Sequence, residues 1–254
     1  MGREAVEQLL LPAECLLCRA LLSFRDAARL VCDVCRHRWR PVRPPWCARC
    51  GQPEPLFGRC RLCAEWPAAF GLARSAVWLD AGARDAVHAL KYGGLPRIAM
   101  DLAAAMVGLD VPGRDSGLLV PVPLGRARFR DRGYNQSERL ARALGRRWQR
   151  PVVDLLVRTR DTAAQTALTP EARLANVAGA FQLRIGDCGL RIESGKLQST
   201  IRNPKSAMER PLVLVDDVFT TGATLAQAAR ALDRAGAHTV SAVTFGRAVV
   251  PDFT

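Results

Sequence analysis

The sequence of 254 residues predicts an α/β protein: a parallel sheet flanked by helices, preceded by a small cysteine-rich module. Two observations carry this prediction. Four Cys-x-x-Cys pairs lie between residues 15 and 63. After them, short runs of consecutive apolar residues alternate with amphipathic segments of helical period, as in sheets covered on both faces. We therefore expect two units, a module over residues 1–67 and an α/β domain over residues 68–254.

The composition is that of a globular protein with anionic partners. Hydrophobic residues make up 49% of the chain, and no run approaches the roughly 18–20 apolar residues of a membrane span. The first fifteen residues include Glu4 and Glu7 and lack the apolar centre of a secretory signal, so we expect a cytoplasmic protein with no transmembrane segment. A net charge of +13 indicates nucleotides, nucleic acid or acidic lipid headgroups as partners.

The paired cysteines predict two structural zinc ions. Each Cys-x-x-Cys pair presents two thiolates to one metal ion, and two pairs complete a tetrahedral site that leaves no open position. Chain order favours one site from Cys15, Cys18, Cys32 and Cys35 and a second from Cys47, Cys50, Cys60 and Cys63. A cross-braced pairing, first with third and second with fourth, is the alternative. Trp39, Trp46 and Trp66 are expected to pack a small core within the module.

The next elements follow from periodicity and from glycine. Residues 76–79 are expected to form a short strand, and residues 83–90 a helix that ends at Gly93 and Gly94. Residues 98–109 have the pattern of a second amphipathic helix. The apolar run at 118–122 predicts a buried strand.

A strongly basic segment follows this strand. We expect a loop from Pro123 that carries Arg126, Arg128, Arg130 and Arg132. A helix should then begin at Asn135 as N-cap and end near Gly145. Residues 118–160 hold eleven arginines and three acidic residues, a net charge of +8. This concentration of guanidinium groups favours an anion, since arginine binds phosphate groups bidentately.

Residues 213–225, VLVDDVFTTGATL, contain the clearest candidate site. Three apolar residues predict a buried strand, with Asp216 and Asp217 at its carboxyl end. A turn rich in hydroxyl groups follows and leads into a helix over residues 225–235; the next buried strand is expected at 239–245. Backbone N–H groups at a helix N-terminus bind phosphate, and the two carboxylates can accept hydrogen bonds from ribose hydroxyls or hold Mg²⁺.

This block resembles the 5-phosphoribosyl-1-pyrophosphate (PRPP) signature of type I phosphoribosyltransferases. The resemblance implies that Asp216 and Asp217 lie beside the ribose hydroxyls, with Mg²⁺ accompanying PRPP. It also implies that Arg126 and Arg128, in the loop after the first core strand, bind the pyrophosphate. The 5′-phosphate would be held by the turn, which comprises Thr220, Thr221, Gly222, Ala223 and Thr224.

Nearly the whole chain resembles the ComF/GntX family, proteins with a double zinc ribbon ahead of a phosphoribosyltransferase domain. The motifs are LKYGG at 90–94, VPVPL at 120–124, RGYNQ at 132–136 and a spaced set of residues from Arg158 to Phe181. The resemblance implies PRPP binding and, in competent bacteria, a part in DNA uptake, with single-stranded DNA and other competence proteins as possible partners. It implies a mobile loop over residues 158–176. Two functions stay open: a PRPP-dependent transferase with an unknown acceptor, and a PRPP-binding factor with little or no turnover.

Residues 185–210 depart from the family pattern. Lys, Ser, Asn and Gln replace the Arg and Ala that are common elsewhere, and QSTIRNP at 198–204 is followed by the similar KSAMERP at 205–211. Prolines at the same phase of this near-repeat exclude a coiled coil. We expect an inserted, disordered and dispensable surface loop.

Overall fold

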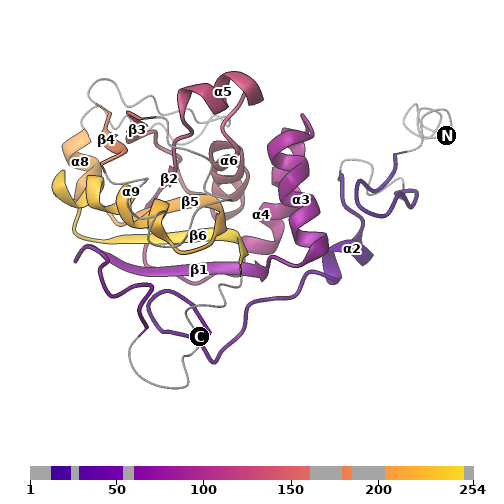
Figure 1. The fold of residues 1–254 in the computed structure, drawn as a ribbon, viewed down its shortest axis with the longest axis horizontal. Coiled ribbons are helices and arrows are strands. Elements are labelled where there is room, and N and C mark those ends of the chain that lie inside the picture. The colour runs from indigo at the N-terminus through magenta and orange to yellow at the C-terminus, as the bar shows by residue number, and fades with distance from the viewer. Residues whose placement is uncertain (1–12, 24–28, 54–59, 161–178, 185–203, 249–254) are drawn as a thin grey trace.

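The computed structural model describes residues 13–23, 29–53, 60–160, 179–184 and 204–248 (Figure 1). Its centre is a sheet of four parallel strands in the order β1-β6-β5-β2. These strands are β1 (Phe70–Trp78), β2 (Leu118–Pro121), β5 (Leu212–Phe219) and β6 (Val240–Arg247). The predicted α/β class with a parallel sheet is confirmed.

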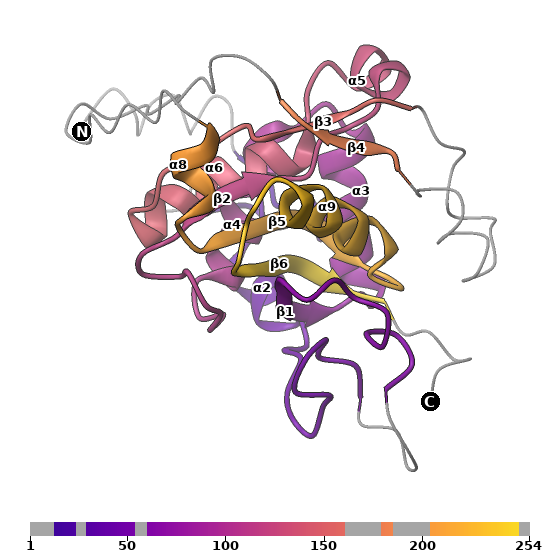
Figure 2. The same cartoon turned by 90° about the vertical axis from the view of Figure 1, so that its left-hand side faces the viewer.

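Helices cover both faces of the sheet (Figures 1 and 2). One face is covered by three helices, α3 (Ala81–Tyr92), α4 (Ala99–Met106) and α6 (Gln136–Trp148). The other is covered by α9 (Ala223–Arg234) and by an antiparallel hairpin, β3 (Leu156–Arg158) with β4 (Phe181–Leu183). Along β5, Leu212 and Leu214 belong to one hydrophobic cluster while Val213 and Val215 belong to the other. Burial on both faces explains the continuous apolar run.

Most predicted elements are present, with shifted ends. Strand β1 begins six residues earlier than expected, because its first half, at the edge of the sheet, includes Gly71 and Arg74 and so lacks a continuous apolar run. Helix α3 begins at the N-cap Asp80, whose carboxylate accepts from the Ala83 N–H at 3.1 Å, and it ends at Gly93 as expected. The helix expected over 98–109 is shorter, because α4 begins only after the 3₁₀ turn η2 (Pro96–Ile98) and ends at Met106, where a turn through Gly108 begins.

Two predictions in the basic segment are wrong. The expected loop after Pro123 is instead the helix α5 (Arg126–Arg132), which ends at Gly133 with φ of 78°. Helix α6 does not end near Gly145 but continues to Trp148. Gly145 serves a different purpose, because a Cβ there would lie 2.8 Å from the Arg150 carbonyl oxygen of the returning chain.

The prediction of a disordered insertion is wrong for its last residues. Residues 204–208 form the helix α8 (Pro204–Met208), and Ala207 and Met208 are 0% and 4% exposed in the cluster that α9 also joins. Arg210 donates a hydrogen bond to the Ser116 carbonyl at 2.7 Å. The remainder of the predicted insertion, with Cys188, lies outside the described residues, as do residues 161–176 of the predicted mobile loop.

The cysteine-rich module packs on the sheet. Trp39 contacts Phe245 of β6 edge-on, with ring centroids 4.9 Å apart. Trp66 stacks on Phe70 of β1 at 4.0 Å. Trp39 and Trp66 thus pack with cysteines of the module, and the cores around them are shared with the sheet rather than confined to the module. Within the described ranges, no helix has the length and apolar character needed to cross a bilayer.

Candidate functional site

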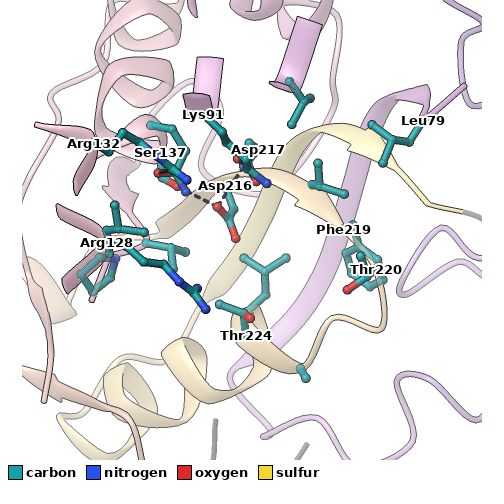
Figure 3. Close-up of a pocket in the computed structure, with 18 of the residues that line it drawn as sticks. Leu79, Lys91, Arg128, Arg132, Ser137, Asp216, Asp217, Phe219, Thr220 and Thr224 are labelled. Carbon is teal, nitrogen blue, oxygen red and sulfur yellow. Dashed lines mark hydrogen bonds and ion pairs between the residues drawn. The ribbon is translucent and has the colours of Figure 1, made fainter. Parts of the chain in front are cut away.

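The acidic pair lies where β5 extends beyond its neighbour β2. The last β2–β5 pair is Pro121 with Val215, whereas pairing with β6 continues to Phe219. Asp216 and Asp217 therefore lie inside β5, and the expectation that the strand ends before them is wrong. Their side chains are buried, and both residues line a cavity that opens beyond the end of β2 (Figure 3).

Each carboxylate has a partner from a distant helix. The Ser137 hydroxyl, in the first turn of α6, donates to Asp216 Oδ1 at 2.7 Å. The Lys91 ammonium, in the last turn of α3, lies 3.0 Å from Asp217 Oδ2. The Lys91 ammonium is the charged partner of this buried Oδ2 atom, which has no other hydrogen-bond partner among the described residues.

Burial and charge set the protonation of the pair. The pKa of Asp216 is raised to about 7, by burial first and by the neighbouring Asp217 charge second, although the Ser137 hydrogen bond and the Lys91 charge act in the opposite direction. Burial alone would lower the pKa of Lys91, but the attraction of Asp217 outweighs it and the pKa is raised. A site with one ammonium between two buried carboxylates favours ligands that bring donors or a cation to Asp216.

The segment 132–137 holds these groups in place. The Tyr134 hydroxyl donates to the Leu90 carbonyl at the end of α3. The Asn135 amide donates to the Val122 carbonyl at 3.0 Å, and its oxygen accepts from the Ser137 N–H as the N-cap of α6. The motif RGYNQ thus joins the end of α3, the end of β2 and the start of α6, which are the elements around the acidic pair.

The turn after β5 directs a helix N-terminus at the cavity. Gly222, with φ of 76°, is the N-cap of α9. Thr220, Gly222 and Thr224 line the cavity, whereas Thr221 is buried and its hydroxyl oxygen accepts from the Ala223 N–H at 3.4 Å. The dipole of a helix with twelve residues favours an anion at this N-terminus.

The cavity has a volume of about 460 Å³ and a cationic wall. Six side chains that can carry positive charge line it: Arg84, His88, Lys91, Arg128, Arg132 and Arg158. Of the predicted site residues, the structure brings together Arg128, the acidic pair and most of the turn. It leaves out Thr221 and the exposed Arg126.

A second cavity of about 350 Å³ adjoins the first, and Lys91, Tyr92, Arg128 and Arg132 line both. Tyr92 is 69% exposed, and the Arg132 guanidinium lies 5.1 Å from its ring centroid. Sequence reasoning did not assign Lys91 or Ser137 to the site, and it placed Arg132 only within the basic segment expected to bind an anion. Lys91 and Arg132 occur in the motifs LKYGG and RGYNQ, and these motifs could have indicated that both residues belong to the site.

The cysteines form two separate groups of four in chain order, and in each group all four sulfur atoms lie within 4.8 Å of one another. A zinc ion bound tetrahedrally at Zn–S distances of about 2.3 Å requires sulfur atoms about 3.8 Å apart. Cys18 and Cys32 are 3.7 Å apart, Cys47 and Cys63 3.7 Å, and Cys50 and Cys60 3.5 Å. Both groups fit structural zinc, and the grouping is the sequential one rather than the cross-brace.

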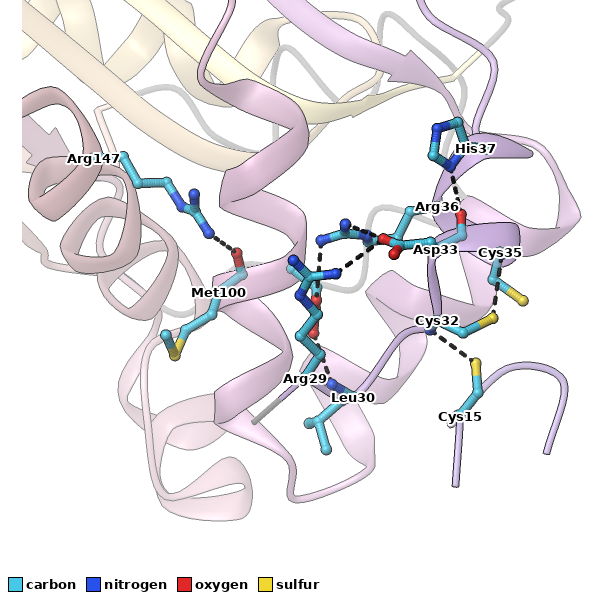
Figure 4. A network of polar contacts seen from close by, with 11 residues as sticks. Cys15, Arg29, Leu30, Cys32, Asp33, Cys35, Arg36, His37, Met100 and Arg147 are labelled. Atoms are coloured by element: carbon cyan, nitrogen blue, oxygen red, sulfur yellow. Dashed lines mark hydrogen bonds and ion pairs between the residues drawn. The ribbon is translucent and has the colours of Figure 1, made fainter. Parts of the chain in front are cut away.

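The first group is attached to α4. Cys32 is the N-cap of the short helix α2 (Asp33–His37). The Leu30 N–H donates to Asp101 of α4 at 3.0 Å, and Arg36 of α2 lies 3.7 Å from the same carboxylate (Figure 4). The Asp101 side chain is 4% exposed, so this contact is a buried connection between the module and the α/β domain.

Comparison with known proteins agrees with both parts of the chain. Residues 6–65 match the family model of the double zinc ribbon domain. DNA utilization protein YhgH of Escherichia coli K12 is 30% identical over 247 residues, which cover 91% of this chain and 96% of that protein. YhgH of Salmonella typhimurium is 32% identical over 248 residues, with the same coverage. Competence protein ComFC of Bacillus subtilis is 27% identical over 252 residues, 92% of this chain and 94% of that one. With such identity over nine tenths of its length, the chain belongs to the ComF/GntX family.

Proposed function

We propose that the chain binds PRPP in the cavity beside Asp216 and Asp217. The observation that carries this proposal is the joint opening of the acidic pair and the α9 N-terminus onto one cavity with a cationic wall. PRPP combines a ribose with a phosphate and a pyrophosphate group, and each part finds complementary chemistry there. Two buried carboxylates would repel a simple anion, so they indicate a ligand that also carries hydroxyl groups or a cation.

The three parts of PRPP would be held by different elements. The N–H groups at the start of α9, with the Thr220 and Thr224 hydroxyls, suit the 5′-phosphate. Asp216 and Asp217 suit the ribose hydroxyls, since charged acceptors form the stronger hydrogen bonds. Arg128 and Arg132 of α5 suit the pyrophosphate. Oxygen ligands such as these carboxylates also fit Mg²⁺, which would neutralise part of the pyrophosphate charge.

Calorimetric titration with PRPP tests this proposal. Replacing both acids, Asp216→Asn with Asp217→Asn, should weaken binding at least tenfold, because each hydrogen bond to a charged group contributes about 1.5–3 kcal/mol. The control Asp110→Asn with Asp115→Asn changes the net charge equally at two exposed positions and should leave the affinity unchanged. Equal affinities of the two double variants would exclude the acidic pair from the site.

For the biological process, we propose a part in DNA uptake. The support comes from the relatives, two named DNA utilization protein and one named competence protein. The charge of the chain agrees with this role, because a net charge of +13 attracts the phosphates of DNA.

The adjoining cavity supports a second candidate, a phosphoribosyltransferase that transfers ribose phosphate to an acceptor. A transferase needs room for an acceptor next to PRPP, and about 350 Å³ beside an exposed tyrosine provides it. Release of pyrophosphate from PRPP, measured with a panel of bases and with or without single-stranded DNA, separates the two functions. Turnover with one of the bases favours the transferase.

A further inference from the structure

The largest fully buried side chain of the described residues is that of Arg247, at the end of β6. Its guanidinium reaches the second cysteine group. Nη1 donates to the Cys50 carbonyl at 2.6 Å, and Nη2 donates to Gln52 Oε1 at 2.7 Å. Gln52 is itself only 1% exposed. A buried cation is strongly unfavourable unless opposite charge lies nearby, and hydrogen bonds to a carbonyl and an amide do not supply that charge.

The second zinc centre supplies the missing charge. Among the described residues, no carboxylate forms an ion pair with Arg247. Four thiolates around one Zn²⁺ leave a formal charge of minus two, and Cys50 is one of the four ligands. The metallated centre is therefore the counter-ion of Arg247, and its backbone carbonyl is the direct contact.

The other side of the guanidinium faces the candidate site. The Arg247 Cζ atom lies 4.1 Å from the centroid of the Phe219 ring, and the Ala248 N–H donates to the Phe219 carbonyl at 2.9 Å. Phe219 is 1% exposed and lines the cavity. Its ring lies so close to Gly222 that a Cβ there would be 2.6 Å from Phe219 Cζ. The ring thus fixes the turn that directs the α9 N-terminus into the cavity.

We propose that Arg247 is a positioning residue that couples the second zinc centre to this cavity. The metallated cysteines hold Arg247, Arg247 holds the Phe219 ring, and the ring holds the phosphate-binding turn at Gly222. The inference rests on the proposed function, because the cavity is taken to bind PRPP. The first zinc centre has no part in this sequence of contacts, since its cysteines belong to the other hydrophobic cluster.

The variant Arg247→Met in the full chain tests the coupling, because it keeps an apolar stem and removes the charge. PRPP affinity with Mg²⁺ should fall about five- to thirtyfold. Hydrogen exchange of the backbone over residues 219–226 should accelerate. The matched control Arg29→Met removes a guanidinium beside the first zinc centre, where Arg29 pairs with Asp33 at 3.0 Å, and should change neither quantity. The milder Gln52→Leu keeps every zinc ligand and should shift both quantities in the same direction by a smaller factor.

Zinc release tests the same coupling at the second zinc centre instead of at the cavity. Coupling between two sites is reciprocal in binding free energy, so PRPP should raise the zinc affinity of the second centre by the same factor by which zinc raises the affinity for PRPP. We also expect PRPP to slow the transfer of zinc from the second centre to a chromogenic chelator. One of two release phases should respond in the wild type and neither in Arg247→Met. If the wild type fails to bind PRPP, the proposed function is wrong, and exchange over residues 219–226 still decides the coupling. Unchanged exchange in both Arg247→Met and Gln52→Leu would overturn it.

Discussion

At the scale of single residues, the site depends on Asp216, a carboxyl group whose ionisation is unfavourable in its buried position. Asp216 is buried next to a second carboxylate, and its strongest partners are a neutral hydroxyl and a lysine that is already paired with Asp217. The pKa of Asp216 is raised to about 7 by burial first and by the Asp217 charge second. Without a ligand, this carboxyl group is therefore only partly ionised near neutral pH, and a ribose hydroxyl or a metal ion at this position would favour its charged form.

The proton of the Asp216 carboxyl group makes stability depend on pH. The unfolded chain releases it near the ordinary value of 3.8 and the native chain only near 7, so between these values the native state binds more protons. The free energy of unfolding should therefore be highest at acidic pH and fall as pH rises towards 7, by at most about 4 kcal/mol from this group. Urea denaturation of the zinc-loaded protein at several pH values without Mg²⁺, compared with Asp216→Asn, isolates the effect. Parallel profiles for the two proteins would contradict it.

The sequence identified the two acids but not their partners. Asp216 and Asp217 occur in a local pattern of strand, acids, turn and helix, which is readable in thirteen residues. Lys91 and Ser137 reach the acids only through the tertiary fold, from α3 and α6. No local pattern relates residues so far apart in the chain. For Thr221 the local pattern predicted too much. Its neighbours Thr220 and Gly222 line the cavity, but the Thr221 side chain is buried and does not line it.

At the scale of helices and strands, burial decided which predictions were right. The runs at 118–122 and 213–215 are apolar because both faces of the sheet are covered, and both strands were found. The short helices α5 and α8 were not. Arginine alternates with other residues in α5, which buries none of its side chains, so no apolar period is present. The polar composition of α8 likewise gives no apolar period. Of the side chains that the structure describes in this helix, only those of two adjacent residues, Ala207 and Met208, are buried in the hydrophobic cluster around α9.

Helix α8 should contribute to stability although it lies in a segment that composition marks as dispensable. Met208 is 4% exposed within the cluster formed around α9. Met208→Ala should lower the free energy of unfolding by about 2–5 kcal/mol, the range for truncating a buried large side chain. The exposed neighbour serves as control, since Glu209→Ala should change it by about 0.5 kcal/mol or less.

Two deletions also test whether α8 stabilises the domain. Removing residues 187–203 leaves α8 whole, and removing residues 187–209 takes it away. Only the longer deletion should lower the melting temperature. If the two deletions melt alike, α8 does not stabilise the domain.

At the scale of the whole molecule, the zinc centres belong to the same hydrophobic clusters as the sheet. Cys15 and Cys35 pack in the cluster that contains Phe245 of β6, and Cys50 and Cys63 in the cluster that contains Phe70 of β1. The spacing of cysteines predicted both centres and their sequential grouping. It could not predict this division, because the apolar residues that the module contacts come from strands far along the chain.

The clusters make zinc removal a test of the whole fold. We expect elemental analysis to find two zinc ions per chain, one for each group of four cysteines. A structural zinc ion contributes about 10–16 kcal/mol of apparent binding free energy in small peptides, as much as the 5–15 kcal/mol that typically stabilises a domain.

If the module were an independent unit, chelation would unfold it and leave the sheet intact. Because each group of cysteines is packed into a cluster of the sheet, we expect chelation to destabilise both parts in one cooperative transition. Hydrogen exchange within β5, measured before chelation, after it and after zinc is restored, distinguishes the two cases. Full protection of β5 in the metal-free protein would show that the contacts of the tryptophans and cysteines with the sheet contribute little to its stability.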